Sequence, residues 1–192
     1  MGMKMKIMNV LVALVLLLLS SCASTSQLEV YHDQNFDFGS VRTAAVMPFE
    51  NLSRDNLAAN RVRDVFMNML LSTGAIYVLP AGEVARGITR AGIEKPTAPS
   101  LEEIKKLGGI VKADAVITGV VREYGEVRSG TTSSNVISFS LQMIETQTGR
   151  VVWTAASTRG GITTKDRLLG GGGQPMNDVT RDAVIEVINK LF

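Results

Sequence analysis

The sequence contains a single cysteine, Cys22, which ends an N-terminal segment built like a secretory signal. Lys4 and Lys6 precede about ten apolar residues at 10–19, and small residues lead from there to the cysteine. The apolar run is too short to cross a bilayer as a helix, which needs roughly twenty residues. If Cys22 is used at this cleavage site, no cysteine remains to form a disulfide. The exported part must therefore be held together by its core alone.

Residues 19–22, Leu-Ser-Ser-Cys, resemble a bacterial lipobox, in which the cysteine is lipidated and becomes the first mature residue. The alternative is an ordinary signal peptide at 1–21 followed by an incidental cysteine. Similar lipoproteins carry three acyl chains, including palmitate, and several chains hold a protein stably where one chain binds only marginally. Ala23 stands where an inner-membrane retention signal usually has Asp. We therefore predict lipidation at Cys22 and a periplasm-facing position on the outer membrane of a Gram-negative bacterium.

The mature chain would be electrically neutral and large enough for one domain. Removing 21 of the 192 residues leaves 171, enough for a single hydrophobic core. Cleavage takes away Lys4 and Lys6 and no acidic residue, which lowers 20 basic residues to 18, equal to the 18 acidic ones. Without a basic surplus, nucleic acid is not an expected partner.

The first half of the predicted domain follows a strand, helix, strand pattern. Residues 41–49 (VRTAAVMPF) form an apolar run that stops at Pro48, since proline cannot donate to a sheet ladder. Over 57–72 apolar residues recur at three- and four-residue steps, which predicts an amphipathic helix packed on a sheet. The stripe comprises Leu57, Val62, Val65, Phe66, Met69 and Leu70. Residues 75–79 (AIYVL) predict a second strand, parallel to the first through a right-handed crossover.

Two further helices lead to the most apolar strand of the chain. A weaker helix is predicted over 81–91. Ser100 should cap another helix, because Glu103 three residues later completes a capping box, and we expect this helix to end at Gly108 and Gly109. Residues 113–121 (ADAVITGVV) should form the central strand, with an extension toward 127.

An antiparallel meander is predicted next. After a polar turn at 129–135, apolar and polar residues alternate over 137–143, as in a strand with one face in the core and the other in water. A tight turn at 146–149 leads into a returning strand at 151–157.

The pattern predicts an α/β fold with a single domain at 41–192. We expect a mixed sheet of about five strands, a βαβ crossover followed by the meander, with flanking helices in two or three layers. Residues 22–40 are predicted to be a lipidated tether whose aromatic second half docks on the domain. A glycine-rich segment at 160–175 precedes a closing helix at 178–192, with Asp178 as its expected cap.

Three internal stretches, with the lipobox, carry a family resemblance. They are AAVMPFEN at 44–51, the pair Leu107-Gly108 with ADAVITG at 113–119, and ETQTGRVVW at 145–153. Together they resemble the periplasmic domain of the curli secretion channel family (CsgG-like lipoproteins). That domain is similar to the N-terminal domain of TolB and to the lipoprotein activator of a penicillin-binding protein. These motifs describe strand starts and turns, so they specify a fold better than a function.

The resemblance implies a secretion-related envelope protein that works through protein–protein contacts. Its partners would be envelope proteins or further copies of itself, in envelope assembly or export. Activation of a peptidoglycan synthase is the alternative. The curli channel inserts two long hairpins per subunit to form its pore. Of the matching segments here, 122–135 carries four charges and a Ser/Thr-rich tip, and 158–175 has no alternating apolar face in either half. We therefore expect no pore from this chain alone.

No constellation of catalytic residues is visible. His32 is the only histidine and Cys22 would be lipidated, so a Cys/His pair or a histidine-rich zinc site is not available. The glycines at 170–173 lack the Lys-Ser/Thr ending of a phosphate loop. We predict a protein that is not an enzyme and uses no cofactor or metal.

Four residues are candidates for partner contacts. Tyr124, between Arg122 and Arg128 in the sequence, is the preferred exposed contact. Trp153 on the returning strand fits either the core or an interface.

Overall fold

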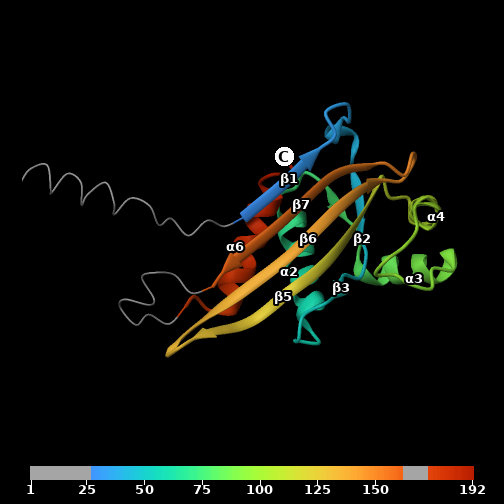
Figure 1. Cartoon of the computed structure of the whole chain (residues 1–192). Helices are drawn as coiled ribbons and strands as arrows, with labels where there is room; N and C mark the ends of the chain where they lie inside the picture. Colours follow the sequence, from blue (N-terminus) through green and yellow to red (C-terminus); the bar gives the residue numbers. More distant parts are fainter. Residues whose placement is uncertain (1–26, 162–172) are drawn as a thin grey trace, which may run out of the picture.

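A seven-stranded mixed sheet organises the chain (Figure 1). The structure, a computed structural model, describes residues 27–161 and 173–192. Six strands lie in the order β1-β7-β6-β5-β2-β4, and the short β3 also pairs with β5. The strands are β1 (Gln27–His32), β2 (Thr43–Val46), β3 (Glu50–Asn51), β4 (Tyr77–Val78), β5 (Ala115–Ser129), β6 (Thr132–Glu145) and β7 (Val151–Gly160). The predicted parallel pairing of β2 with β4 and the antiparallel meander β5-β6-β7 are both confirmed.

Four α-helices among the described residues cover the sheet unevenly. They are α2 (Ala58–Ser72), α3 (Ala81–Ala91), α4 (Leu101–Val111) and α6 (Met176–Ile188). α2 and α6 pack on one face, whereas α3 and α4 pack on the other face around β2, the start of β5 and the ends of β6 and β7 that flank their turn. The domain thus has three layers at one end and two layers over the meander. Within the described residues, no helix is both long and apolar enough to cross a membrane.

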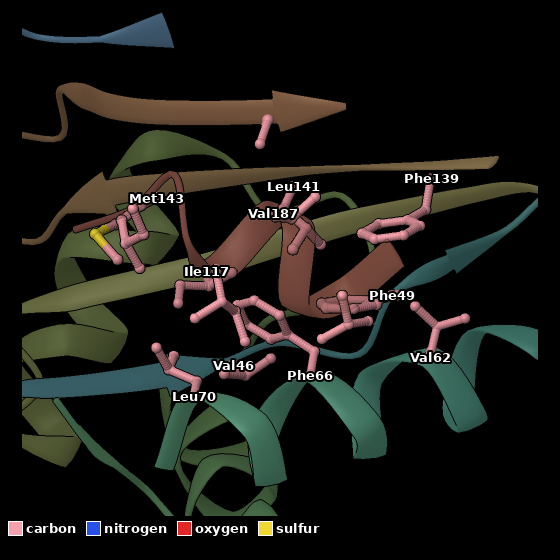
Figure 2. Packing of buried hydrophobic residues seen from close by; sticks show 14 of the residues in the cluster. Val46, Phe49, Val62, Phe66, Leu70, Ile117, Phe139, Leu141, Met143 and Val187 are labelled. Carbon is pink, nitrogen blue, oxygen red and sulfur yellow. The ribbon is translucent and has the colours of Figure 1, made fainter. Parts of the chain in front are cut away.

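The α2 stripe is the centre of the larger core (Figure 2). Val62, Phe66 and Leu70 are fully buried, and the Phe66 ring lies 6.2 Å from the Phe49 ring, centroid to centroid. Val65 is partly buried at the edge of this cluster. The predicted stripe is therefore confirmed, except that Leu57 precedes the helix and is exposed.

The alternation in β6 divides its residues between core and solvent as predicted. Ile137, Phe139, Leu141 and Met143 are all buried against α2 and α6. The polar residues between them lie on the opposite face, which the helices leave open over the meander.

The sheet has two more strands than predicted, because β1 comes from the segment assigned to the tether and the short β3 follows β2. β1 pairs antiparallel with β7 from Gln27↔Thr158 to His32↔Trp153. His32 Nε2 lies 2.5 Å from the carbonyl oxygen of Lys190, and its ring packs edge-on against Phe38. His32 is thus a packing residue. Residues 27–32 of the predicted tether at 22–40 are thus a strand of the sheet, and residues 22–26 lie outside the described residues.

Three element boundaries differ from the predictions. α4 continues through Gly108 and Gly109 to Val111, and it ends at Lys112 in the left-handed conformation, although its Ser100–Glu103 capping box is confirmed. α6 begins after Pro175, and Asp178 lies in its first turn without being the cap. The turn predicted at 129–135 is shorter, because β5 and β6 stay paired up to Ser129↔Thr132.

The family-like motifs join the parallel strands to the meander. Asp114 Oδ2 accepts hydrogen bonds from the backbone N–H groups of Arg42 and Thr43, both at 2.9 Å. Thr146 Oγ1 donates to the carbonyl oxygen of Ala113 at 2.7 Å. These contacts are internal, so the motifs serve the fold.

Candidate functional site

The open face of the meander carries a groove of about 780 Å³. Its floor is formed by β5, β6, β7 and β1, and one wall is formed by residues 97–101 with the start of α4. The groove exists because α4 covers the sheet only as far as the rung that joins Val116 and Ile144. We call it the open-face groove.

Two rows of side chains form the floor of the open-face groove. Each row, or rung, consists of residues that are paired across neighbouring strands. The first rung runs Thr118, Gln142, Thr154, Tyr31 across four adjacent strands, and the second runs Val120, Ser140, Ala156, Glu29. Neighbouring strands lie about 4.8 Å apart, so each rung is about 14 Å wide. The floor is therefore a mostly neutral surface four strands wide.

The first rung offers free hydrogen-bonding groups. Among the described residues, the side chains of Thr118, Gln142 and Thr154 have no hydrogen-bond partner, and Gln142 is exposed. Each hydroxyl both donates and accepts, and the amide of Gln142 does both as well. These groups can bind a partner without first breaking an internal bond.

Arg122 lies on this face at a bulge in β5. The register between β5 and β6 shifts between Val121 and Glu123, which leaves Arg122 as the extra residue. Its Nη1 donates to Ser140 Oγ at 3.0 Å, and the side chain is otherwise exposed. The charged residues that line the groove are Arg122, Glu29 and Glu50.

The same bulge buries Tyr124, so the prediction of an exposed contact there is wrong. Val121 faces the core, and regular alternation would place Glu123 beside it. The extra residue reverses the phase, and Tyr124 points inward with 8% of its surface exposed. The core interpretation of Trp153 is the correct one, because its side chain is fully buried and Nε1 donates to the carbonyl oxygen of Lys190 at 3.2 Å.

Of the four predicted contact residues, only Arg122 lines the groove. Arg128 is exposed but lies farther along the β5–β6 hairpin, where it pairs with Glu126 at 3.0 Å. Sequence reasoning missed Thr118, Gln142, Thr154 and Tyr31 as site residues. The alternation in β6 marked Gln142 as solvent-facing, but only the tertiary placement of α4 makes a groove of that face.

The wall of the groove is rigid at the start of α4. The Ser100 backbone N–H donates to Glu103 Oε2 at 2.7 Å, and this bond lowers the pKa of the Glu103 carboxyl. Glu103 N–H donates in turn to Ser100 Oγ. Leu101, beside this cap, presents an exposed apolar side chain to the groove. The wall thus adds an apolar contact to a polar floor.

The described residues offer binding groups and no metal cluster. Within 27–161 and 173–192, no group of three or more His, Cys, Asp or Glu side chains is placed to hold a metal ion. Cys22 and the glycines at 170–172 lie outside the described residues, so their predicted roles stay predictions. The groove can hydrogen-bond a partner and cover apolar surface.

Residues 34–190 match the family described as "Putative lipoprotein GNA1162-like". The chain belongs to the GNA1162-like lipoprotein family. This confirms the coarse prediction of a lipoprotein, whereas the likeness to the curli secretion channel finds no support and stays a resemblance of motifs. A search of curated proteins finds no match.

Solved structures share this fold at low sequence identity. Lipoprotein GNA1162 from Neisseria meningitidis is 20% identical with a TM-score of 0.57, covering 78% of this chain and 97% of that one. A PelC dodecamer from Paraburkholderia phytofirmans is 17% identical with a TM-score of 0.57, covering 87% and 97%. The C-terminal domain of LpoB from Salmonella enterica is more distant, at 15% identity and a TM-score of 0.47, covering 61% and 81%. The first two likenesses establish the fold.

Proposed function

We propose that this protein is a non-enzymatic lipoprotein, anchored in the outer membrane at Cys22 and facing the periplasm. In this proposal it serves envelope assembly or export by binding envelope proteins, or copies of itself, through the open-face groove. The observation that carries the proposal is the rung of unpartnered polar side chains on a sheet face that no described helix covers.

The composition of the groove supports a protein as the partner. Protein interfaces combine apolar anchors with a polar surround, and aromatic residues are enriched among the anchors. Tyr31 at one end and Leu101 at the wall are half-exposed apolar side chains. Between them the polar rung supplies hydrogen bonds. A groove about 14 Å wide accommodates a helix or an extended segment of a partner.

A protein of the same fold associates with copies of itself. The PelC structure is that of a dodecamer, and this chain covers 97% of the PelC subunit. The dodecamer is a property of PelC, and it supports further copies of the chain as a candidate partner here.

The alternative function, activation of a peptidoglycan synthase, requires a tether long enough for the domain to reach a synthase away from the anchoring membrane. Five residue steps separate Cys22 from Gln27, the first residue of the sheet. At 3.3–3.6 Å per residue they span at most about 18 Å. This short link favours work close to the anchoring membrane.

The anchor is tested by the mass of the mature N-terminus. We expect membrane-extracted protein to begin at Cys22 and to carry a diacylglyceryl group with a further acyl chain. The Cys22→Ser variant should lose the lipid and leave the membrane fraction. An unmodified N-terminus produced by cleavage at another residue would refute the anchor.

The groove is tested by photocrosslinking in intact cells. A benzophenone amino acid at Gln142, on the groove floor, should capture a defined envelope protein or a second copy. The same group at Asn68, on the exposed side of α2, is the control and should not capture it. Equal capture from both positions would place the interface elsewhere.

A blocking variant separates groove binding from folding. Thr154→Arg places a long side chain across the floor, and we expect capture from Gln142 to fall at least several-fold. Because Thr154 lies on the solvent face, the unfolding free energy should change by no more than about 0.5 kcal/mol. Undiminished capture by a folded Thr154→Arg protein would contradict the proposal.

A further inference from the structure

The β5–β6 hairpin extends beyond the rest of the sheet. Among the described residues, the last rung that includes β7 joins Val136 to Gly160, the Gly161 N–H donates to the Asn135 carbonyl oxygen, and β5 and β6 pair with each other from Glu126↔Asn135 out to Ser129↔Thr132. The base of this extension is packed, because Asn135 Nδ2 donates to the Gln174 carbonyl oxygen at 2.8 Å. We call residues 128–133 the hairpin tip.

We propose that the hairpin tip rests on the lipid surface in which Cys22 is anchored and forms a second contact of the domain with the membrane. This inference rests on the lipid anchor proposed above. It follows from the length of chain between the anchor and the sheet, and from where that chain joins the sheet.

The strand register sets the farthest level that the anchor can reach along the strand direction. β1 and β6 run in the same direction, since both are antiparallel to β7. Gln27 and Ser138 lie on the same rung, because both pair with Thr158. Cys22 is five residues before Gln27, and Ser133 is five residues before Ser138. A fully extended link therefore carries Cys22 no farther along the strand direction than the level of Ser133.

The tip reaches past that level. The turn residues Gly130 and Thr131 lie beyond Ser133, and any bend in the link brings the membrane closer to them. Figure 1 shows the start of β1 and the hairpin tip at the same end of the molecule, with α3 and α4 at the other end. With the strands pointing toward the bilayer, the anchored lipid and the tip meet the same surface.

The chemistry of the tip fits the headgroup layer. Thr131 and Arg128 are exposed, and hydroxyl and guanidinium groups donate hydrogen bonds to phosphate oxygens. Glu126 beside them is held by Ser133 and Arg128, whose hydrogen bonds lower its pKa, so the extension has no net charge. Because residues 128–133 include no apolar side chain, the tip should stay among the headgroups and not enter the hydrocarbon.

This contact fixes the height of the open-face groove. Gln142 is ten residues beyond Thr132, the first residue of β6 next to the turn, which places it about 34 Å from the lipid surface at 3.4 Å per residue. The groove then opens sideways, parallel to the membrane, where it meets proteins anchored beside it.

A nitroxide at the tip tests the contact in the full lipidated chain. The lipidated Cys22 does not react with a thiol label, so Thr131→Cys gives a single labelling site. The matched control is Lys95→Cys, an exposed position in the loop between α3 and α4 at the opposite end. The protein is reconstituted in vesicles of phosphatidylethanolamine and phosphatidylglycerol that contain a lipid with a nickel chelate on its headgroup.

We expect the nickel lipid to enhance relaxation of the Thr131→Cys label several-fold more than that of the Lys95→Cys label. Equal enhancement at both sites, or a larger effect at Lys95→Cys, would overturn the inference, because the domain would then be tilted or inverted. Mass measurement of the same samples separates the two proposals. Protein without lipid refutes the anchor, whereas lipidated, vesicle-bound protein with an unaffected tip label refutes only the tip contact.

Discussion

The Phe66→Asp variant is expected to be unfolded at room temperature. The Phe66 side chain is fully buried in the centre of the α2 stripe, next to Phe49 (Figure 2). Loss of the ring alone costs about 3–5 kcal/mol. An unpaired carboxylate in the same place adds a desolvation cost of several kcal/mol. Domains of this size have an unfolding free energy of only about 5–15 kcal/mol. The two costs together therefore remove most or all of that stability.

Circular dichroism and thermal unfolding of the purified protein measure this effect. The matched control is Asn68→Asp, two residues further along α2, where the same charge is placed on the exposed side. We expect its unfolding free energy to stay within about 0.5 kcal/mol of wild type. Val65→Asp should fall between the two, since Val65 is partly buried. A Phe66→Asp protein that melts like wild type would show that this stripe is not the core.

The parts of the fold that were predictable are those encoded by local periodicity. The α2 stripe, the alternation in β6 and the bounds of α3 depend only on which neighbouring side chains are apolar. The burial of Phe66 and Phe139 follows directly from that contrast. The capping box at Ser100 and Glu103 is also a local signal, because both partners lie within one turn.

The parts that were missed depend on residues far apart in the sequence. β1 is a short edge strand whose partner, Thr158, is more than a hundred residues away, so nothing near Gln27 marks it as a strand. The bulge at Arg122 changes the phase of β5, and a pattern of alternation cannot show where a residue is inserted. That single residue explains why Tyr124 is buried and Glu123 is exposed.

The groove was not predictable for the same reason. Polar residues on the outer face of a meander are typical of any half-solvated antiparallel sheet. They become a site only because α4 starts beside them and forms a wall. The position of α4 is in turn set by the packing of Ile104 and Leu107 in the second core and by the close approach of Gly108 to Thr146 at the β6–β7 turn.

Gly108→Val is expected to destabilise the domain by about 2–3 kcal/mol, because the helix has no room for a side chain at this position. A Cβ on Gly108 would lie 2.3 Å from Thr146 Cγ2 and 2.4 Å from Thr146 Cβ. Thr146 cannot rotate away freely, since its Oγ1 donates to the Ala113 carbonyl oxygen. Either α4 moves off the turn or Thr146 loses that bond.

The next residue, Gly109, provides the control within the same helix. A Cβ on Gly109 meets nothing within 4 Å, and the position is exposed. Gly109→Val should therefore change the unfolding free energy by no more than about 0.5 kcal/mol, because the helix propensities of valine and glycine differ little. Urea unfolding of the two variants measures the difference directly. Similar midpoints for Gly108→Val and Gly109→Val would mean that α4 does not pack on the turn at Thr146, and the wall of the open-face groove would then lack its support.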